Sequence, residues 1–563
     1  MKVVIIGGVA GGATAAARLR RLDETAEITV FEKSGFISYA NCGLPYYIGG
    51  TIEDEEELTL QTPESFYSRF RVDMRVNHEV TAIHPERKTV TVKNLSDGSI
   101  FDESYDKLII STGAKPVKPK FSEIDNSNIF TLRTVEDTLA IKNYIDTQKP
   151  HSAVVAGGGF IGIEVAENLR QLGLDVTIVQ GDPQLMLPFD PDMAAFIHSE
   201  VRKHGINLML NSMVESFEEK DGKTLVKIKN GTSVTADMII LAIGVSPDAS
   251  LAKEAGLKLG IRGSICVNDR MQTSDPDIYA VGDAVQIKNF VTEKQTLISL
   301  AGPANKQGRI AADNICGRDS RYNGGQASSV IKIFDLTAAA TGINEKTAAD
   351  TGIEYDKVIL SPLSHAGYYP GGKIMTMKVI FEKESYRILG AQIIGFDGVD
   401  KRIDVIATAL RSGLKAYELS ELDLAYAPPY SSAKDPVNIA GYMIENLKNG
   451  IVKQWYYEDL DKLLRNSSIT LLDTRTPGEF SRGHIDRFIN IPVDELRSRI
   501  SELDKSKPVY VICQSGLRSY IASRILTGYG FEAYNFAGGF RFYDAVSNDK
   551  AMNEKCTPCG MDY

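Results

Sequence analysis

The stretch "KVVIIGGVAGGATAAARLRRLDETAEITVFE", residues 2–32, decides the fold at the start of the chain. It contains an apolar run, a glycine-rich turn, a run of small and basic residues, and a second apolar run. This order predicts a strand, a helix and a second strand parallel to the first, because strands of a buried parallel sheet are continuously apolar. The glycines would let the backbone approach a pyrophosphate, whose charge the free N–H groups at the helix start would bind.

The same order of elements returns about 150 residues later. Residues 152–180 contain strand "SAVVAG", turn "GGFIG", helix "IEVAENLRQL" and strand "DVTIVQ". This second copy carries Gly157-x-Gly159-x-x-Gly162, which matches the dinucleotide-binding fingerprint in full. The chain therefore repeats one β-α-β unit.

The first copy departs from the fingerprint at one position. Gly7-x-Val9-x-x-Gly12 has valine where the middle glycine is expected. Glu32 nevertheless ends the second strand, where a carboxylate suits a pair of ribose hydroxyls. A glycine-rich turn without a ligand is the alternative, but two copies in one chain favour two bound dinucleotides.

The composition is that of a globular protein with several domains. A chain of 563 residues is too long for one core and predicts about three or four domains. The net charge of −10 and the single Trp argue against a nucleic-acid partner. No apolar run reaches the roughly 18 residues that would span a bilayer, and the glycines and arginines of residues 1–22 argue against a signal peptide. We expect a cytoplasmic protein with no membrane partner.

Six cysteines are too few for a disulfide framework and indicate thiols in a reducing compartment. For Cys266 and Cys316 the expected role is packing. Cys556-x-x-Cys559, in the tail, could be a redox dithiol, half of a zinc site, or part of an unremarkable tail. No second pair or nearby His completes a zinc tetrad, so we expect no metal.

Two further motifs indicate which family of dinucleotide-binding proteins the chain resembles. "LIISTGAKP", residues 108–116, looks like the strand and turn that cross between two dinucleotide folds, and "TSDPDIYAVGD", residues 273–283, looks like a second flavin motif. With the repeated unit, they resemble the two-dinucleotide-fold flavoprotein disulfide reductases from residue 1 to about 325. The resemblance implies FAD in the first fold and NADH or NADPH in the second. The implied FAD-binding residues are Gly7, Val9, Ala10, Gly11, Gly12, Glu32, Lys33, Thr112, Gly113, Asp283 and Ala301.

The choice between NADH and NADPH depends on the end of the second strand in the second fold. An acid there favours NADH, and arginines just after it favour the 2′-phosphate of NADPH. The chain has Gln180-Gly181-Asp182, with neither feature, so the missing arginine favours NADH and leaves NADPH open. The implied NAD(P)H-binding residues are Gly157, Gly159, Phe160, Ile161, Gly162, Gln180 and Gly244.

The segment "FISYANCGLPYYIGG", residues 36–50, holds one cysteine, Cys42, and the next in the chain is Cys266. The segment resembles the active-site loop of coenzyme A-disulfide reductases and of their persulfide-reductase relatives, which use a single cysteine. Without a resolving thiol, Cys42 would form a mixed disulfide with a molecule that leaves, or a sulfenic acid. Its thiolate would be the reactive form. A packed cysteine is the alternative.

The same resemblance implies a coenzyme A site around this loop. Two arginines lie three residues apart on the first helix, hence on one face, and could bind phosphates. A solvated helix face is the alternative for both. The implied coenzyme A residues are Arg18, Arg21, Ser38 and Asn41.

Residues 326–448 are similar to the dimerisation domain of these enzymes, so we expect a homodimer. The segment "LDLAYAPPYSSAKDPVN", residues 422–438, resembles the one that reaches the partner's active site. Tyrosines there would donate hydrogen bonds to the sulfur or carbonyl of the substrate, and half-buried packing is the alternative for each. The candidate donors are Tyr426 or Tyr430, with Tyr368 or Tyr369.

Residues 449–550 contain strands "ITLLDTR" and "VYVI", loop "CQSGLRS" and helix "SYIASRIL", and resemble a single rhodanese domain. Cys513 would lie between a strand end and a helix start, among N–H groups that lower its pKa and stabilise a persulfide. Arg518 would close the loop or bind an anionic sulfur donor. A small phosphatase is the alternative, but such loops have one more residue between cysteine and arginine. The residues expected to brace the fold are Asp473, Arg475 and Glu479.

Together these features predict an α/β chain with two Rossmann-like dinucleotide-binding domains, an α+β dimerisation domain and a C-terminal α/β rhodanese domain. The FAD-binding domain is expected to be discontinuous. The predicted bounds are 1–115 with 245–325 for FAD binding, 116–244 for NAD(P)H binding, 326–448 for dimerisation, 449–550 for the rhodanese domain and 551–563 for the tail.

The predicted activity is FAD-dependent reduction of coenzyme A persulfide, polysulfide or coenzyme A disulfide by NAD(P)H through Cys42, with Cys513 binding or delivering sulfane sulfur. A persulfide is favoured, because a sulfur-handling domain has no obvious purpose in plain disulfide reduction. One rival is an NADH oxidase or peroxidase in which Cys42 cycles through a sulfenic acid. Another is a persulfide-carrying redox sensor. The sequence leaves open whether coenzyme A is substrate or tightly bound, and whether Cys513 passes sulfur to Cys42.

Overall fold

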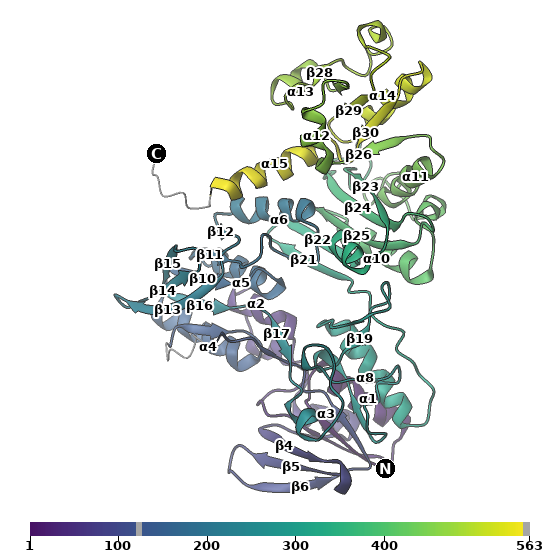
Figure 1. Cartoon of the computed structure of the whole chain (residues 1–563). Coiled ribbons are helices and arrows are strands. Elements are labelled where there is room, and N and C mark those ends of the chain that lie inside the picture. The colour runs from purple at the N-terminus through teal and green to yellow at the C-terminus, as the bar shows by residue number, and fades with distance from the viewer. Residues whose placement is uncertain (120–126, 556–563) are drawn as a thin grey trace. The chain divides into compact units, whose positions relative to one another are not determined.

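The first β-α-β unit forms as its sequence predicts. In the computed structural model (Figure 1), which describes residues 1–119 and 127–555, β1 (Lys2–Ile6) pairs in parallel with β2 (Glu27–Phe31). α1 (Ala10–Leu22) connects the two strands and buries four alanines, Ala13, Ala15, Ala16 and Ala17. The continuous apolar runs are thus strands of a buried parallel sheet.

A five-stranded parallel sheet, in the order β18-β7-β1-β2-β3, forms the first dinucleotide fold. α8 (Ala301–Ile315) packs on α1 so closely that a Cβ at Gly308 would lie 2.3 Å from the carbonyl oxygen of Gly11. Because β18 follows the second fold in sequence, the first fold contains chain from either side of the second. The remaining strands are β3 (Asp73–Arg75), β7 (Lys107–Ile110) and β18 (Ile278–Ala280).

The second dinucleotide fold repeats this design with a sheet in the order β12-β11-β10-β16-β9, also parallel. α5 (Phe160–Gln171) connects β10 to β11, and α4 (Val135–Gln148) precedes them. The predicted repeat is therefore confirmed, whereas the predicted domain bounds stay a prediction. The strands are β9 (Ile129–Thr131), β10 (Ser152–Ala156), β11 (Asp175–Val179), β12 (Asn207–Met209) and β16 (Met238–Leu241).

Two three-stranded antiparallel sheets extend these folds. In sequence, one lies between β3 and β7 of the first parallel sheet and the other between β12 and β16 of the second. Their strands are β4 (His78–His84), β5 (Thr89–Asn94) and β6 (Ile100–Ser104) in one, and β13 (Val214–Lys220), β14 (Lys223–Ile228) and β15 (Ser233–Ala236) in the other.

The chain divides into two units: unit 1 comprises residues 1–185 and 205–327, and unit 2 comprises residues 186–204 and the chain from Ser328 onward. α6 (Pro191–Lys203) follows β11 in sequence but belongs to unit 2. Among the described residues, no helix is both long enough and apolar enough to cross a membrane.

Unit 2 begins with a five-stranded antiparallel sheet in the order β21-β22-β25-β24-β23. Its long inner strands are almost completely buried. α10 (Val399–Ser412) packs on β22 and β25. The antiparallel sheet with helices matches the predicted α+β domain. The strands are β21 (Ser329–Ile333), β22 (Leu336–Gly342), β23 (Tyr355–Leu360), β24 (Met375–Glu382) and β25 (Ile388–Gly395).

The last sheet is parallel, in the order β26-β30-β29-β27-β28, and corresponds to the predicted rhodanese domain. α14 (Leu517–Gly528) follows β29, and α15 (Gly539–Lys555) follows β30 and packs on α6. Asp549 of α15 accepts a hydrogen bond from His198 of α6 at 2.8 Å. The strands are β26 (Lys453–Trp455), β27 (Thr470–Asp473), β28 (Ile489–Asn490), β29 (Val509–Ile512) and β30 (Ala533–Phe536).

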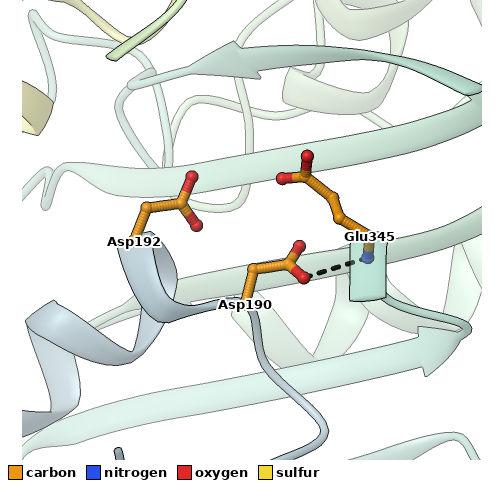
Figure 2. Close-up of side chains that lie close together, drawn as sticks. All are labelled: Asp190, Asp192 and Glu345. Carbon is orange, nitrogen blue, oxygen red and sulfur yellow. Dashed lines mark hydrogen bonds between the residues drawn. The ribbon is translucent and has the colours of Figure 1, made fainter. Parts of the chain in front are cut away.

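A buried ionic cluster joins the start of α6 to the antiparallel sheet. Figure 2 shows the carboxylates of Asp190, Asp192 and Glu345 turned toward one another, with the Glu345 amide donating to Asp190 at 2.9 Å. Among the described residues these three could hold a metal ion. The ammonium of Lys378, fully buried on β24, instead lies 3.2, 2.6 and 2.6 Å from their oxygens. The cluster already has its cation, so we assign no metal to it.

Candidate active sites

The two glycine-rich turns have the same geometry. Gly7 and Gly157 adopt the left-handed backbone, with φ of +99° and +111°, that favours glycine. A Cβ at Gly12 would lie 1.9 Å from the carbonyl oxygen of Gly7, and one at Gly162 would lie 2.1 Å from that of Gly157. The first and third glycines of each turn are therefore required by the packing of helix against strand.

The middle glycine of the second turn has a different role. Gly159 has no atom within 4 Å of the place where its Cβ would lie, so packing does not require glycine there. Such open space lets a pyrophosphate approach the first N–H groups of α5. Val9 holds the same position before α1, and the N-cap residues of both helices make no side-chain hydrogen bond. The first N–H groups of both helices therefore have no side-chain cap.

The two folds also share a polar contact at the end of the second strand. The Glu32 carboxylate accepts from the Gly8 amide at 2.8 Å, and the Gln180 side-chain oxygen accepts from the Gly158 amide at 2.9 Å. Burial raises the pKa of Glu32, and its bonds to Gly8 and Ser34 partly offset this. Each side chain is thus held against the turn that would face the dinucleotide.

The other predicted FAD residues follow the strands of the first sheet. Asp283, just after β18, accepts from Arg133 at 2.8 Å, and the Thr112 hydroxyl donates to the carbonyl of Asp248 at 2.6 Å. Parallel strands end at one edge of a sheet, so these residues meet at the same edge as the glycine-rich turn. Ala10 and Gly11 lie in the first turn of α1, Lys33 follows Glu32, Gly113 lies in the turn after β7, and Ala301 is the first residue of α8.

The predicted NAD(P)H residues meet at the corresponding edge of the second sheet. Phe160 and Ile161 open α5, and Gly244 follows β16 with φ of +107°. Gln180 donates to the Asp182 carboxylate at 2.9 Å. The strand end thus carries an amide and a carboxylate and no arginine directly after it.

Cys42 lies in a short 3₁₀ helix, η1 (Asn41–Gly43), directly before α2 (Leu44–Ile48). The residue is exposed, and its thiol is free. Desolvation by the surrounding protein raises its pKa, Glu164 and Asp283 raise it further, and Arg133 lowers it. The protein by itself therefore favours the thiol over the thiolate that we expected to react.

Glu164 is a residue that the sequence reasoning missed. It lies in the first turns of α5, and Tyr46 of α2 donates a hydrogen bond to it. Burial, and then the charge of Glu167, raise the pKa of Glu164 to about 7. An ionisable carboxylate therefore faces the Cys42 segment from the second fold. The available signal was an acid two residues after the third fingerprint glycine.

The predicted coenzyme A residues have unequal surroundings. Ser38 and Asn41 lie in the Cys42 loop, and Ser38 adopts a left-handed φ of +46°. Arg21 is exposed, but Arg18 is paired with Asp313 of α8 at 2.7 Å. To bind a phosphate, the Arg18 guanidinium would have to leave Asp313 or contact both groups at once.

The structure brings two of the predicted tyrosines together. The hydroxyls of Tyr368 and Tyr426 lie 2.7 Å apart, and both side chains are exposed. The hydrogen bond to Tyr368 raises the pKa of Tyr426. Tyr430 is 71% exposed, and Tyr369 packs edge-on to His365. Among the four, Tyr368 and Tyr426 form a polar pair open to solvent.

Arg402 of α10 fastens the tyrosine segment to the domain. Its buried guanidinium donates to the Tyr430 carbonyl at 3.2 Å and to the Asp435 carboxylate at 3.0 Å. Asp435 also accepts from the Ser431 hydroxyl at 2.6 Å. The segment is thus held at its base while its tyrosines face outward.

The rhodanese-like loop holds Cys513 between β29 and α14, as predicted. Its sulfur accepts a hydrogen bond from the Gly516 amide and one from the Ser519 hydroxyl, both at 3.2 Å. The residue is completely buried. Its carbonyl accepts from the Phe540 amide of α15 at 2.7 Å. Two donors therefore converge on the sulfur.

Arg518 does not face a vacant anion site, because Glu479 pairs with it in bidentate fashion at 2.7 and 2.8 Å. Glu479 also completes a capping box with Thr476 at the start of α13 (Pro477–Ser481). The bond from Arg518 lowers the pKa of Glu479 to about 2. Of the two roles expected for Arg518, closing the loop fits these contacts.

Asp473 and Arg475 form a buried ion pair at 2.7 Å at the end of β27. Arg475 also donates to the Gly483 carbonyl at 2.8 Å and lies over the ring of Phe540. These contacts agree with the expectation that both residues brace the fold. Cys556 and Cys559 lie outside the described residues.

Comparison with known proteins identifies the family. Residues 1–308 match the family described as pyridine nucleotide-disulphide oxidoreductase, residues 328–436 match its dimerisation domain, and residues 456–545 match the rhodanese-like domain. The chain is a pyridine nucleotide-disulphide oxidoreductase. The resemblance to flavoprotein disulfide reductases is therefore confirmed.

Three individual proteins are similar to this oxidoreductase over most of its length. A coenzyme A disulfide reductase of Staphylococcus haemolyticus is 38% identical over 447 residues, 79% of this chain and 100% of the relative. The reduced CoADR-RHD of Bacillus anthracis is 49% identical, with a TM-score of 0.95 over 97% of this chain and 98% of that one. A NAD-dependent persulfide reductase from A. fulgidus is 37% identical, with a TM-score of 0.91 over 96% and 100%.

A more distant relative bears on the oxidase alternative. The water-forming NADH oxidase of Lactobacillus brevis is 28% identical to this oxidoreductase, with a TM-score of 0.77 over 80% of this chain and 100% of that one. Its identity and TM-score are lower than those of the two solved structures named above, so the comparisons support the oxidase alternative only weakly.

The cofactors of this oxidoreductase are FAD and a nicotinamide dinucleotide, and the residues fit both. The first fold offers uncapped N–H groups at α1 and the Glu32 carboxylate at a strand end. The second offers the open space at Gly159 and the side chain of Gln180. These are the donors and acceptors that a pyrophosphate and a ribose require.

Proposed function

We propose that this oxidoreductase uses NADH to reduce a persulfide or a disulfide of coenzyme A through Cys42. The observation that carries the proposal is the isolation of that thiol: Cys42 is exposed and free, and Cys266, Cys316 and Cys513, the other cysteines among the described residues, are free as well. None of these four thiols is bonded to another, so we infer that a disulfide at Cys42 forms with a molecule that later leaves. NADPH stays open as the electron donor.

The chemistry balances for either substrate. The Cys42 thiolate attacks the coenzyme A sulfur of the persulfide, forming a Cys42–coenzyme A disulfide and releasing hydrosulfide with the electron pair of the broken bond. With the disulfide, the leaving group is a coenzyme A thiolate. Bound FAD supplies the relay of two electrons from the nicotinamide. Two electrons and one proton then split the mixed disulfide into the Cys42 thiolate and free coenzyme A.

The leaving sulfur needs a hydrogen-bond donor, and we assign this role to the Tyr368–Tyr426 pair of the partner subunit in a homodimer. The pair is exposed, lies in the dimerisation domain and has two hydroxyls 2.7 Å apart. A phenol stabilises a thiolate by donating its O–H without being ionised. Tyr430 and Tyr369 would support the surface around the pair.

Coenzyme A would be held at the Cys42 loop. Ser38 and Asn41 lie in the same loop as the thiol, and exposed Arg21 is the more available cation for a phosphate because Arg18 already pairs with Asp313. Several weak contacts of this kind would allow the product to leave.

Cys513 would carry the sulfane sulfur. A persulfide has an anionic outer sulfur, and the N–H groups at the start of α14 suit such a charge. The A. fulgidus relative named as a persulfide reductase matches 96% of this chain and supports a persulfide as substrate, while the CoADR-RHD of Bacillus anthracis, which matches 97%, keeps coenzyme A disulfide beside it.

The test is NADH oxidation under nitrogen by the wild type, Cys42→Ser and Cys513→Ser, each offered coenzyme A persulfide, polysulfide and coenzyme A disulfide. We expect Cys42→Ser to lose turnover, and persulfide to give the highest kcat/KM with one sulfide released per NADH. Consumption of NADH only after oxygen is readmitted would instead identify an oxidase. A single flavin reduction without further turnover would identify a sensor.

A further inference from the structure

The rhodanese-like loop contains a buried hydroxyl aimed at the reacting sulfur. Ser519 lies in the first turn of α14 and is completely buried. Its hydroxyl lies 3.2 Å from Cys513 Sγ and 3.1 Å from the carbonyl oxygen of Gly516. A hydroxyl carries one proton, so it can donate to only one of these acceptors at a time.

The charge on the sulfur decides which acceptor receives that proton. A hydrogen bond to an anion is roughly twice as strong as one between neutral groups. When Cys513 is neutral or carries an extra sulfur, the carbonyl of Gly516 competes for the hydroxyl. When Cys513 becomes a thiolate, the sulfur is the stronger acceptor. The donor is already in place, so no group has to move to meet the new charge.

We propose that Ser519 is a catalytic residue of sulfur transfer, whose hydroxyl stabilises the negative charge on Cys513 Sγ when sulfur is handed on. The inference rests on the proposed role of Cys513 as a sulfane-sulfur carrier. It adds Ser519 to Gly516, whose amide also donates to the sulfur at 3.2 Å.

The step balances without an oxidant or reductant. In charging, the Cys513 thiolate attacks the outer sulfur of thiosulfate, the sulfur–sulfur bond of thiosulfate breaks, and sulfite leaves with the electron pair. In discharge, a coenzyme A thiolate attacks the outer sulfur of the Cys513 persulfide. The bond between that sulfur and Sγ breaks, coenzyme A persulfide forms, and the electron pair returns to Sγ. Ser519 donates to Sγ at this point.

The chain offers a matched control in the same helix. Ser523 is also buried, and its hydroxyl donates to the Ser519 carbonyl at 2.8 Å, with no contact to the sulfur. Ser523→Ala therefore removes a buried hydroxyl from α14 without removing a donor to Cys513. Ser519→Thr keeps a hydroxyl where Ser519→Ala removes it.

The experiment uses the full-length holoprotein and two readouts. The first is the rate at which Cys513, charged with thiosulfate, passes sulfur to coenzyme A. The second is the pH midpoint for alkylation of Cys513 by iodoacetamide, followed by mass spectrometry of its peptide. We expect Ser519→Ala to slow discharge about ten- to a hundredfold and to raise the alkylation midpoint by about one pH unit or more. Ser523→Ala should match the wild type, and Ser519→Thr should recover part of the loss.

The inference would be overturned if a folded Ser519→Ala protein discharged sulfur at a rate within twofold of the wild-type rate and had the wild-type alkylation midpoint. An equal loss in Ser523→Ala would overturn it too, because the effect would then belong to the helix. Thermal unfolding of each variant checks the fold. If wild-type Cys513 accepts no sulfur from thiosulfate or from coenzyme A persulfide, the carrier function fails, and the alkylation midpoint still decides whether Ser519 stabilises the thiolate.

Discussion

At the scale of single residues, the two thiols that we assign to sulfur chemistry have opposite surroundings. Cys42 is exposed, and the carboxylates of Glu164 and Asp283 act on it. Cys513 is buried, and two donors reach its sulfur. The exposed thiol of Cys42 suits attack on a bulky substrate, whereas the donors around Cys513 suit a sulfur that becomes negatively charged.

Replacing Glu164 with Gln should lower the pKa of Cys42. A nearby negative charge disfavours the thiolate, and Glu164, with a pKa of about 7, carries that charge increasingly as the pH rises above 7. The Glu164→Gln protein should therefore alkylate faster at Cys42 above pH 7 and equally fast below pH 6.

The measurement is the pH profile of iodoacetamide alkylation of Cys42, with Glu254→Gln as the control, since Glu254 is an exposed carboxylate on α7 (Ser250–Glu254). A profile unchanged by Glu164→Gln, or changed equally by the control, would contradict the assignment of Glu164 as the charge that faces Cys42.

At the scale of elements, side chains far apart in sequence decide how α6 and α13 are anchored. α6 begins at the ionic cluster of Figure 2, where Lys378 of β24 neutralises carboxylates that burial would otherwise leave uncompensated. Burial by itself would raise the pKa of Glu345, but the ammonium groups of Lys378 and Lys357 lower it to about 2. Removing the cation would leave like charges together in a low dielectric.

Lys378→Met should destabilise unit 2 strongly. Breaking a buried ion pair by removing one partner typically costs about 3–5 kcal/mol, because the other charge is left unpaired. The matched control is Lys373→Met, at an exposed lysine shortly before the same strand, which should change little. Urea unfolding followed by circular dichroism measures both. A loss below about 1 kcal/mol for Lys378→Met would show that surrounding groups or water replace the ammonium.

The Glu479–Arg518 pair should make stability depend on pH in acid. The pKa of Glu479 in the folded protein, about 2, lies below its ordinary value of 4.5. The pair therefore stabilises the fold above pH 4.5, and this contribution is lost as the pH falls from 4.5 toward 2. Glu479→Gln should be less stable than the wild type at pH 7, with a difference that shrinks below pH 4.5 in thermal unfolding. A difference independent of pH would point to lost packing instead.

At the scale of the whole molecule, the proposed reaction needs groups from both units. Cys42 and the dinucleotide folds belong to unit 1, whereas Tyr368, Tyr426 and Cys513 belong to unit 2. The match of residues 328–436 to a dimerisation domain provides the means of assembling such a site from two copies of the chain.

A mixed dimer tests this assembly. Tyr426→Phe should slow turnover about ten- to a hundredfold, because a charge-assisted hydrogen bond to the leaving sulfur is lost. If the tyrosine acts on the partner's thiol, dimers of one Cys42→Ser subunit and one Tyr426→Phe subunit contain one intact site. Equal amounts of the two variants, unfolded and reassembled together, should recover about a quarter of wild-type activity.

Activity in that mixture no higher than the mean of the two variants would contradict assembly across subunits. Tyr442→Phe, at an exposed tyrosine of α11 (Pro436–Lys448), is the control for a changed surface phenol and should leave turnover intact.

The sequence alone determined the parts whose signal is local. Continuous apolar runs and glycines at set spacing specify β-α-β units, because period, turn geometry and backbone contacts involve residues close in the chain. The Cys42 and Cys513 loops were found for the same reason. Ser519 was missed although it lies in the quoted loop, because a hydroxyl becomes a donor to sulfur only when the first helical turn places it there.

The tertiary structure decided which groups meet across long separations. Arg18 pairs with Asp313, Tyr46 with Glu164, and Lys378 with Asp190, although each pair is more than a hundred residues apart in the chain. The spacing of residues in a sequence does not indicate such pairs, because it does not distinguish a solvent-exposed arginine or lysine from one that forms an ion pair in the folded protein. The charge and burial around each thiol depend on the packing of distant segments. The sequence therefore predicted which thiols react, and the structure defined their surroundings.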